Sequence, residues 1–180
     1  EKARRLLRSY QENLLNGGKF YFMKKDYAKA YDFFSCYLVA ADKGFFEFDD
    51  TTHQDSVTRR IARWATSSAY KLNDPTKVLA HSSLALEDSA VRRFIYEYQA
   101  KAHLALGDTT KWLATLRDGL MHDPDYSYFF ASLTDYLNAN RRYEEALHLT
   151  DTMLSFRPQS TFFWYAKSLV LLNLKRYEEC

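Results

Sequence analysis

Apolar residues along this chain recur at the spacing of amphipathic helices. Two sets that fall on one helix face are Leu133, Tyr136 and Leu137, and Leu147, Thr150 and Leu154. No alternating strand pattern of comparable length is present. Asp74-Pro75 and Gly107-Asp108 interrupt the helical pattern, each with a turn followed by a helix N-cap. The sequence therefore predicts an all-α chain of short helices joined by tight turns.

The helical pattern repeats at a fixed interval. Residues 141–146 (RRYEEA) match residues 175–180 (KRYEEC) position by position in kind, and a third Tyr-x-x-Ala signature begins at Tyr27. The offset from Tyr27 to Tyr143 is 116 residues, which is three periods of 34 plus 14. One insertion of 14 residues therefore brings the third signature into the same 34-residue repeat, which we call the repeat frame.

A 34-residue unit with these residues resembles the tetratricopeptide repeat, a helix-turn-helix whose pattern is W-x2-L-G-x2-Y, then A-x3-F, then P. Gly18, Tyr21, Ala30 and Phe34 fall on this pattern, whereas Trp112 replaces its Ala in the third unit. The small residues Gly17, Gly18 and Ala30 predict that the two helices of the first unit approach closely. The resemblance implies an all-α fold, a right-handed α-solenoid of stacked antiparallel helix pairs with about 4.5 to 5 repeats in one domain, 1–180. The expected units are 11–44, 59–92, 93–126, 127–160 and a partial 161–180, in a chain that reads as an excerpt of a longer protein.

The frame also predicts where the helices of each pair separate. Turns are expected near 24–26, 72–75, 107–109, 140–143 and 174–176.

The insertion, residues 45–58, has four acids and no Lys or Arg. We expect residues 45–52 to be non-helical, with Asp50 or Thr51 capping an extended helix of the second unit. A metal site formed by Asp49, Asp50, His53 and Asp55 is the weaker alternative, because the Gly and the final Glu of a calcium loop are missing. Neither a metal nor a cofactor is expected.

Charge and chemistry exclude several classes of function. The 25 Lys and Arg against 23 Asp and Glu give a net charge of +2, which does not favour nucleic acid. Residues 1–29 carry a local charge of +5, which we interpret as a solvated helix face rather than a basic docking surface. No apolar run reaches the roughly 20 residues of a membrane span. The five glycines form neither a P-loop nor a dinucleotide fingerprint.

The chain shows no catalytic pattern. Its five histidines never form a metal-ligand spacing, and Cys36 and Cys180 are too few for a disulfide framework. The repeat frame places these two cysteines in distant units, so they are expected to stay unpaired. We therefore predict a protein that is not an enzyme; its compartment is open between cytoplasm and bacterial periplasm.

The resemblance implies an interaction scaffold that binds another protein or a peptide in a concave groove. In the family, the second, fifth and ninth positions of each first helix face this groove. Here they are Phe94, Glu97 and Lys101, then Tyr128, Ala131 and Asp135, then Phe162, Tyr165 and Leu169. Packing of the three recurring rings between repeats, as core, is the open alternative.

Two further points follow from the resemblance. Binding of acidic chaperone tails is disfavoured, because Leu15 and Lys19, and later Glu97 and Lys101, stand where the family's clamp Lys and Asn lie. The rival function is that of a helical accessory domain in a larger enzyme or receptor whose active part lies outside this segment.

Overall fold

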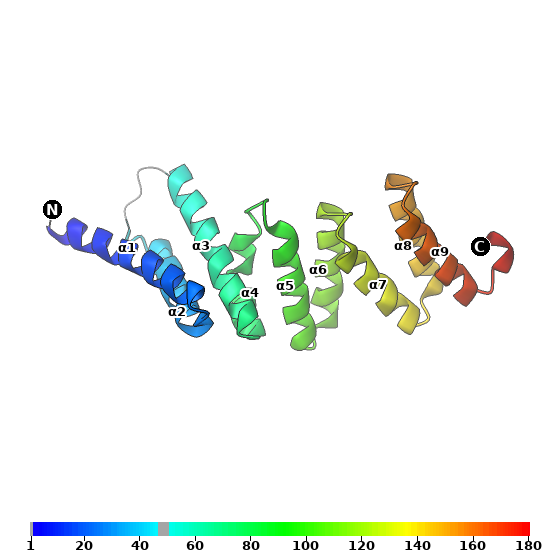
Figure 1. Ribbon diagram of the computed structural model, residues 1–180, viewed down its shortest axis with the longest axis horizontal. Coiled ribbons are helices and arrows are strands. Elements are labelled where there is room, and N and C mark those ends of the chain that lie inside the picture. Colours follow the sequence, from blue (N-terminus) through cyan, green and yellow to red (C-terminus); the bar gives the residue numbers. More distant parts are fainter. Residues whose placement is uncertain (1, 47–50) are drawn as a thin grey trace. The chain divides into compact units, whose positions relative to one another are not determined.

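The computed structural model describes the backbone of residues 2–46 and 51–180 and the side chains of residues 9–46 and 54–180. These residues form nine α-helices, a short 3-10 helix and no strand (Figure 1). The helices are α1 (Lys2–Met23), α2 (Tyr27–Asp42), α3 (Thr51–Lys71), α4 (Pro75–Ala85), α5 (Arg92–Ala105), α6 (Thr109–His122), α7 (Ser127–Ala139), α8 (Tyr143–Phe156) and α9 (Thr161–Asn173), followed by η1 (Tyr177–Glu179). The predicted all-α class is confirmed.

The turn inside each helix pair has the same backbone conformation. One residue in each turn has a positive φ between 55° and 75°, and these residues are Lys25, Asn73, Gly107, Arg141 and Lys175. From Asn73 onward they are evenly spaced by one repeat period, and the insertion widens the interval between Lys25 and Asn73. In every turn the next N–H donates to a carbonyl five residues earlier, as Arg142 does to Leu137 at 2.8 Å. The five predicted turns are thus confirmed. In each, the first helix ends at a C-cap with one residue in the left-handed conformation.

The second helix of each pair begins in one of two ways. Asp26, Asp74 and Asp108 each accept a hydrogen bond from a backbone N–H three residues later. In the last two pairs, the corresponding residues are Arg142 and Arg176, whose guanidinium groups bind Glu145 and Glu179 at 2.6 Å. Because acids near a helix N-terminus complement the macrodipole, Glu145 offsets the loss of a capping carboxylate at Arg142.

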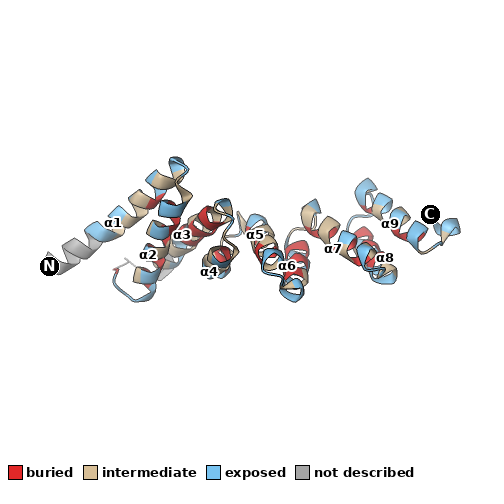
Figure 2. Ribbon diagram, turned by 90° about the horizontal axis from the view of Figure 1, so that it is seen from below, coloured by how far each residue is buried: buried red, intermediate tan, exposed pale blue. Residues whose placement is uncertain are grey.

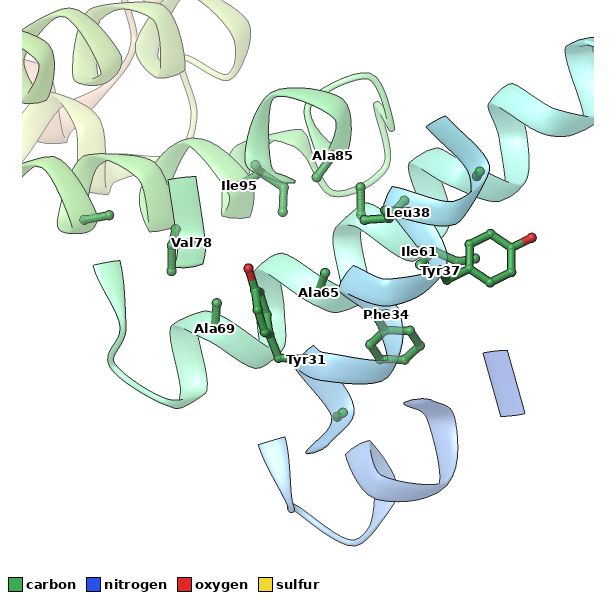
Figure 3. Packing of buried hydrophobic residues seen from close by; sticks show 14 of the residues in the cluster. Tyr31, Phe34, Tyr37, Leu38, Ile61, Ala65, Ala69, Val78, Ala85 and Ile95 are labelled. Carbon is green, nitrogen blue, oxygen red and sulfur yellow. The ribbon is translucent and has the colours of Figure 1, made fainter. Parts of the chain in front are cut away.

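The chain divides into two compact units, residues 1–115 and 116–180, with the boundary inside α6. In the first unit α2 packs on α1 and α3, and α4 packs on α3 and α5. Their side chains form one buried cluster in which Phe34 and Tyr37 of α2 face Ile61 of α3 (Figure 3). The prediction of a single domain stays a prediction.

Small residues allow close approach in the first unit. A Cβ added to Gly17 would lie 2.5 Å from the Phe33 ring, and one on Gly18 would overlap the Phe34 ring. Both glycines therefore let α2 aromatic rings rest directly on the α1 backbone, as the sequence predicts. Figure 2 shows buried residues concentrated where α2 and α3 meet.

The second unit has a smaller core between α7, α8 and α9. Leu137, Ala146 and Val170 are buried there, and Phe130 meets Phe163 edge to face at 4.8 Å. Gly119 of α6 allows the same kind of close contact between a ring and a helix backbone as in the first unit, since a Cβ there would lie 2.5 Å from the Phe129 ring.

One expectation for the insertion is wrong. Thr51 and Thr52, predicted as non-helical, belong to α3, which runs for 21 residues. Val57 packs against the core of the first unit and ties this extra length to the fold. Phe45 and Phe46 are non-helical, as expected. The proposed metal ligands Asp49 and Asp50, and the side chain of His53, lie outside the described residues.

Candidate functional site

The candidate residues on α5 differ in their surroundings. Phe94 is 37% exposed. Glu97 and Lys101 form an ion pair one helical turn apart, with 2.5 Å between Oε1 and Nζ, and Lys101 also donates to the Tyr70 hydroxyl of α3 at 3.1 Å. Partial burial lowers the pKa of Lys101, but its bonds to Glu97 and Tyr70 outweigh this and raise it above the usual lysine value. Lys101 therefore stays charged and is held in place.

Two tyrosines lie beside this pair and were not predicted from the sequence. Tyr70 of α3 and Tyr98 of α5 stack with ring centroids 3.9 Å apart and an interplanar angle of 14°. Burial raises the pKa of Tyr98. Only the repeat frame, which sets consecutive first helices side by side, could have indicated this contact.

In the second unit the candidate residues lie on α7 and α9. Tyr128 is half-buried and meets the Phe129 ring at 5.6 Å, and Asp135 is exposed. Asn173 of α9 donates to the side-chain oxygen of Asn138 of α7 at 3.5 Å. This amide pair was also not foreseen, because neither residue belongs to the repeat pattern.

Helix α9 carries two apolar faces. Phe163, Val170 and Leu171 are buried against the unit. Phe162 and Tyr165, at 43% and 65% exposed, and the exposed Leu169 follow the i, i+3, i+7 spacing of a second face. The Phe162 ring also touches Phe130 at 5.5 Å, so its inner edge is packed. None of the three recurring rings, Phe94, Tyr128 and Phe162, belongs to the buried core.

Each unit also has an open groove beside its second helices. A cavity of about 600 Å³ lies between α2 and α4 and is lined by Leu38, Val39, His81 and Leu84, among others. A second cavity of about 570 Å³ is lined by residues of α6, α7 and α8, including Leu120 and Met121. Val39 and Met121 occupy equivalent repeat positions, because each lies equally far along the chain from the positive-φ residue of its own helix pair.

His81 lies in the wall of the first groove. Its Nε2 is 3.0 Å from the Ser35 hydroxyl of α2, and its ring contacts Tyr31. Burial lowers the pKa of His81, which favours a neutral ring near pH 7. The contact with Ser35 links α2 to α4, so His81 has a structural role.

The described part of the chain offers little other chemistry. No group of three metal-ligating side chains is found among those residues. Cys36 and Cys180 are exposed and free. None of the described helices is long and apolar enough to cross a membrane.

Comparison with known proteins supports the fold. No protein-family model and no curated protein matches the chain. Among solved structures, that of MamA protein aligns with a TM-score of 0.61 and 11% identity, covering 94% of this chain and 85% of that one. At this identity the likeness shows the fold alone. Together with the evenly spaced turns, it confirms a helical-repeat fold of the α-solenoid class that resembles the tetratricopeptide repeat.

Proposed function

We propose that this chain is a non-catalytic scaffold that binds an extended segment of a partner protein along its first helices. The observation that carries the proposal is the second apolar face of α9. Phe162, Tyr165 and Leu169 give it a stripe of exposed side chains, of which Phe162 also contacts the core of the unit, through Phe130 and Phe163. Exposed aromatic residues of this kind are the usual anchors of protein interfaces.

Polar groups beside the stripe favour a peptide over a small apolar ligand. Asp135 is exposed on α7, and the Asn138–Asn173 amide pair offers both donors and acceptors. An extended peptide presents unpaired backbone N–H and C=O groups, which amide side chains satisfy well. In the first unit, Phe94 and the fixed Glu97–Lys101 pair offer the same combination of a ring and polar groups.

The test uses a phage-displayed library of 12-residue peptides selected on the 180-residue chain. Selected peptides should bind the Tyr165→Ala variant at least about 30-fold more weakly, because truncating an interface anchor costs about 2 kcal/mol or more. Since Tyr165 is largely exposed, thermal unfolding should be nearly unchanged. Isothermal titration calorimetry measures the affinity.

Phe156 supplies the matched control. It is an aromatic residue of similar exposure, 59%, and lies on the second helix α8. Phe156→Ala should leave peptide affinity unchanged. If both variants lose affinity equally, or if no peptide is selected at all, the first helices do not form the binding surface.

A further inference from the structure

The three helix-pair turns of the first unit share one edge of that unit. Each pair is antiparallel, and α2 packs on α3 as α4 packs on α5. The α1–α2, α3–α4 and α5–α6 turns consequently lie at the same end of their helices, along the lower edge in Figure 1. We call residues 22–29, 70–77 and 104–111, which contain these turns, the turn edge.

The turn edge is basic. It holds six lysines and three aspartates. Each aspartate is the cap of a second helix and is paired with the lysine three residues later, in the pairs Asp26–Lys29, Asp74–Lys77 and Asp108–Lys111. The other three lysines, Lys24, Lys25 and Lys71, are exposed. They leave the edge with a net charge of +3.

The corresponding turns of the second unit have no such charge. Residues 138–145 and 172–179 hold four basic residues and four glutamates, which balance. Arg142 and Arg176 are bound to Glu145 and Glu179. The same repeat positions thus give a basic edge in one unit and a neutral one in the other.

The turn edge also carries exposed apolar side chains. Met23, next to Lys24, is 83% exposed, and Leu106, next to Gly107, is 51% exposed. One turn before Lys24, the exposed ring of Phe20 lies 4.3 Å from the Lys24 ammonium. Met23 stabilises the unit little, since it buries little surface within it.

We propose that the turn edge docks on a bilayer surface rich in anionic lipid. Lys24, Lys25 and Lys71 would contact the headgroups, and Met23 and Leu106 would enter the boundary between headgroups and acyl chains. Lysines beside apolar side chains are the combination that such a surface binds. A nucleic acid or an acidic protein tail would gain from the lysines but would leave Met23 and Leu106 in water. This inference is independent of the proposed peptide binding.

The experiment measures sedimentation of the 180-residue chain with vesicles. One set is phosphatidylcholine alone, and the other contains about 30% phosphatidylserine. Binding is expected only to the second set and should weaken with added salt, since exposed charges are screened. Lys24→Glu with Lys25→Glu should weaken it at least about 25-fold, because each basic residue near the surface contributes about fivefold. Met23→Ser should weaken it at least about tenfold, because the transfer of the Met23 side chain out of water is lost.

The matched control is Arg141→Glu with Lys175→Glu. These residues hold the same turn position as Lys25 and have the same positive φ, but they lie in the neutral turns. Vesicle binding of this variant should equal that of the unaltered chain, and thermal unfolding should confirm that all variants fold. Equal losses in both double variants, or equal binding to neutral vesicles, would overturn the proposal. Tight binding of soluble polyglutamate that does not change with Met23→Ser would assign the edge to an acidic protein instead.

Discussion

Four residues with side chains hold a backbone conformation that glycine adopts at far lower cost. They are Lys25, Asn73, Arg141 and Lys175, each in the turn of a helix pair. A left-handed conformation costs an ordinary residue about 1 to 2 kcal/mol. Only the α5–α6 turn uses a glycine, Gly107, at this position. These residues keep the left-handed conformation because the flanking helices fix the turn.

Replacing Arg141 with glycine should therefore stabilise the protein. We expect Arg141→Gly to raise the free energy of unfolding by about 0.5 to 1 kcal/mol, since the relief of strain exceeds the entropy that glycine loses on folding. Urea denaturation measures the change. Asn140, the preceding residue, has φ −92° and gains no such relief, so Asn140→Gly should be neutral or destabilising. Equal effects of the two substitutions would show that the turn is not strained.

Helix pairing in the first unit depends on the contact between Gly18 and the Phe34 ring. Alanine favours a helix by about 1 kcal/mol over glycine, so an unhindered Gly18→Ala change would stabilise α1. The added methyl would overlap the buried Phe34 ring, and we expect a net loss of about 1 to 3 kcal/mol in the free energy of unfolding. Thermal unfolding measures it. In a Phe34→Leu background the same change should cost clearly less; an unaltered cost would mean that the helices do not meet there.

Prediction from the sequence succeeded for residue types with a single common structural role, such as small residues at a helix contact or an Asp-Pro pair at a helix start. Gly18 and Ala30 indicated close helices, and Asp74-Pro75 marked a helix start that the structure confirms. It failed at Thr51 and Thr52, because the polar, β-branched start of α3 has no apolar stripe and weak helix propensity. The packing of Val57 and the length of α3 overrule that local preference.

The candidate site was predictable to a smaller extent. The spacing of Glu97 and Lys101 places them one helical turn apart, and they do form an ion pair. The hydrogen bond from Lys101 to Tyr70 could not be predicted from local spacing, because the two residues lie 31 positions apart on different helices. The exposure of Phe162 and Tyr165 likewise depends on which face of α9 the core takes, and both faces are apolar.

The two units differ in charge as well as in size. The first has 18 Lys and Arg against 14 Asp and Glu, and the second has 7 against 9. A net charge near zero for the whole chain therefore conceals a basic unit and an acidic one. The net charge of +2 does not favour nucleic acid, but the lysines that gather on the turn edge support an anionic lipid surface as its partner. This proposal gives Lys24 and Lys25 a docking role, whereas the sequence favoured a solvated face for residues 1–29.

The division into units predicts how the molecule unfolds. In repeat proteins each pair contacts only its neighbours, so a local loss of packing destabilises nearby helices most. Phe34→Ala, which empties a fully buried site in the first unit, should cost about 3 to 5 kcal/mol and speed amide hydrogen exchange in α1, α2 and α3 while α8 and α9 keep their protection. Phe130→Ala, at an equally buried site of the second unit, should produce the reverse pattern. Uniform loss of protection in either variant would instead show that residues 1–180 unfold as one cooperative domain.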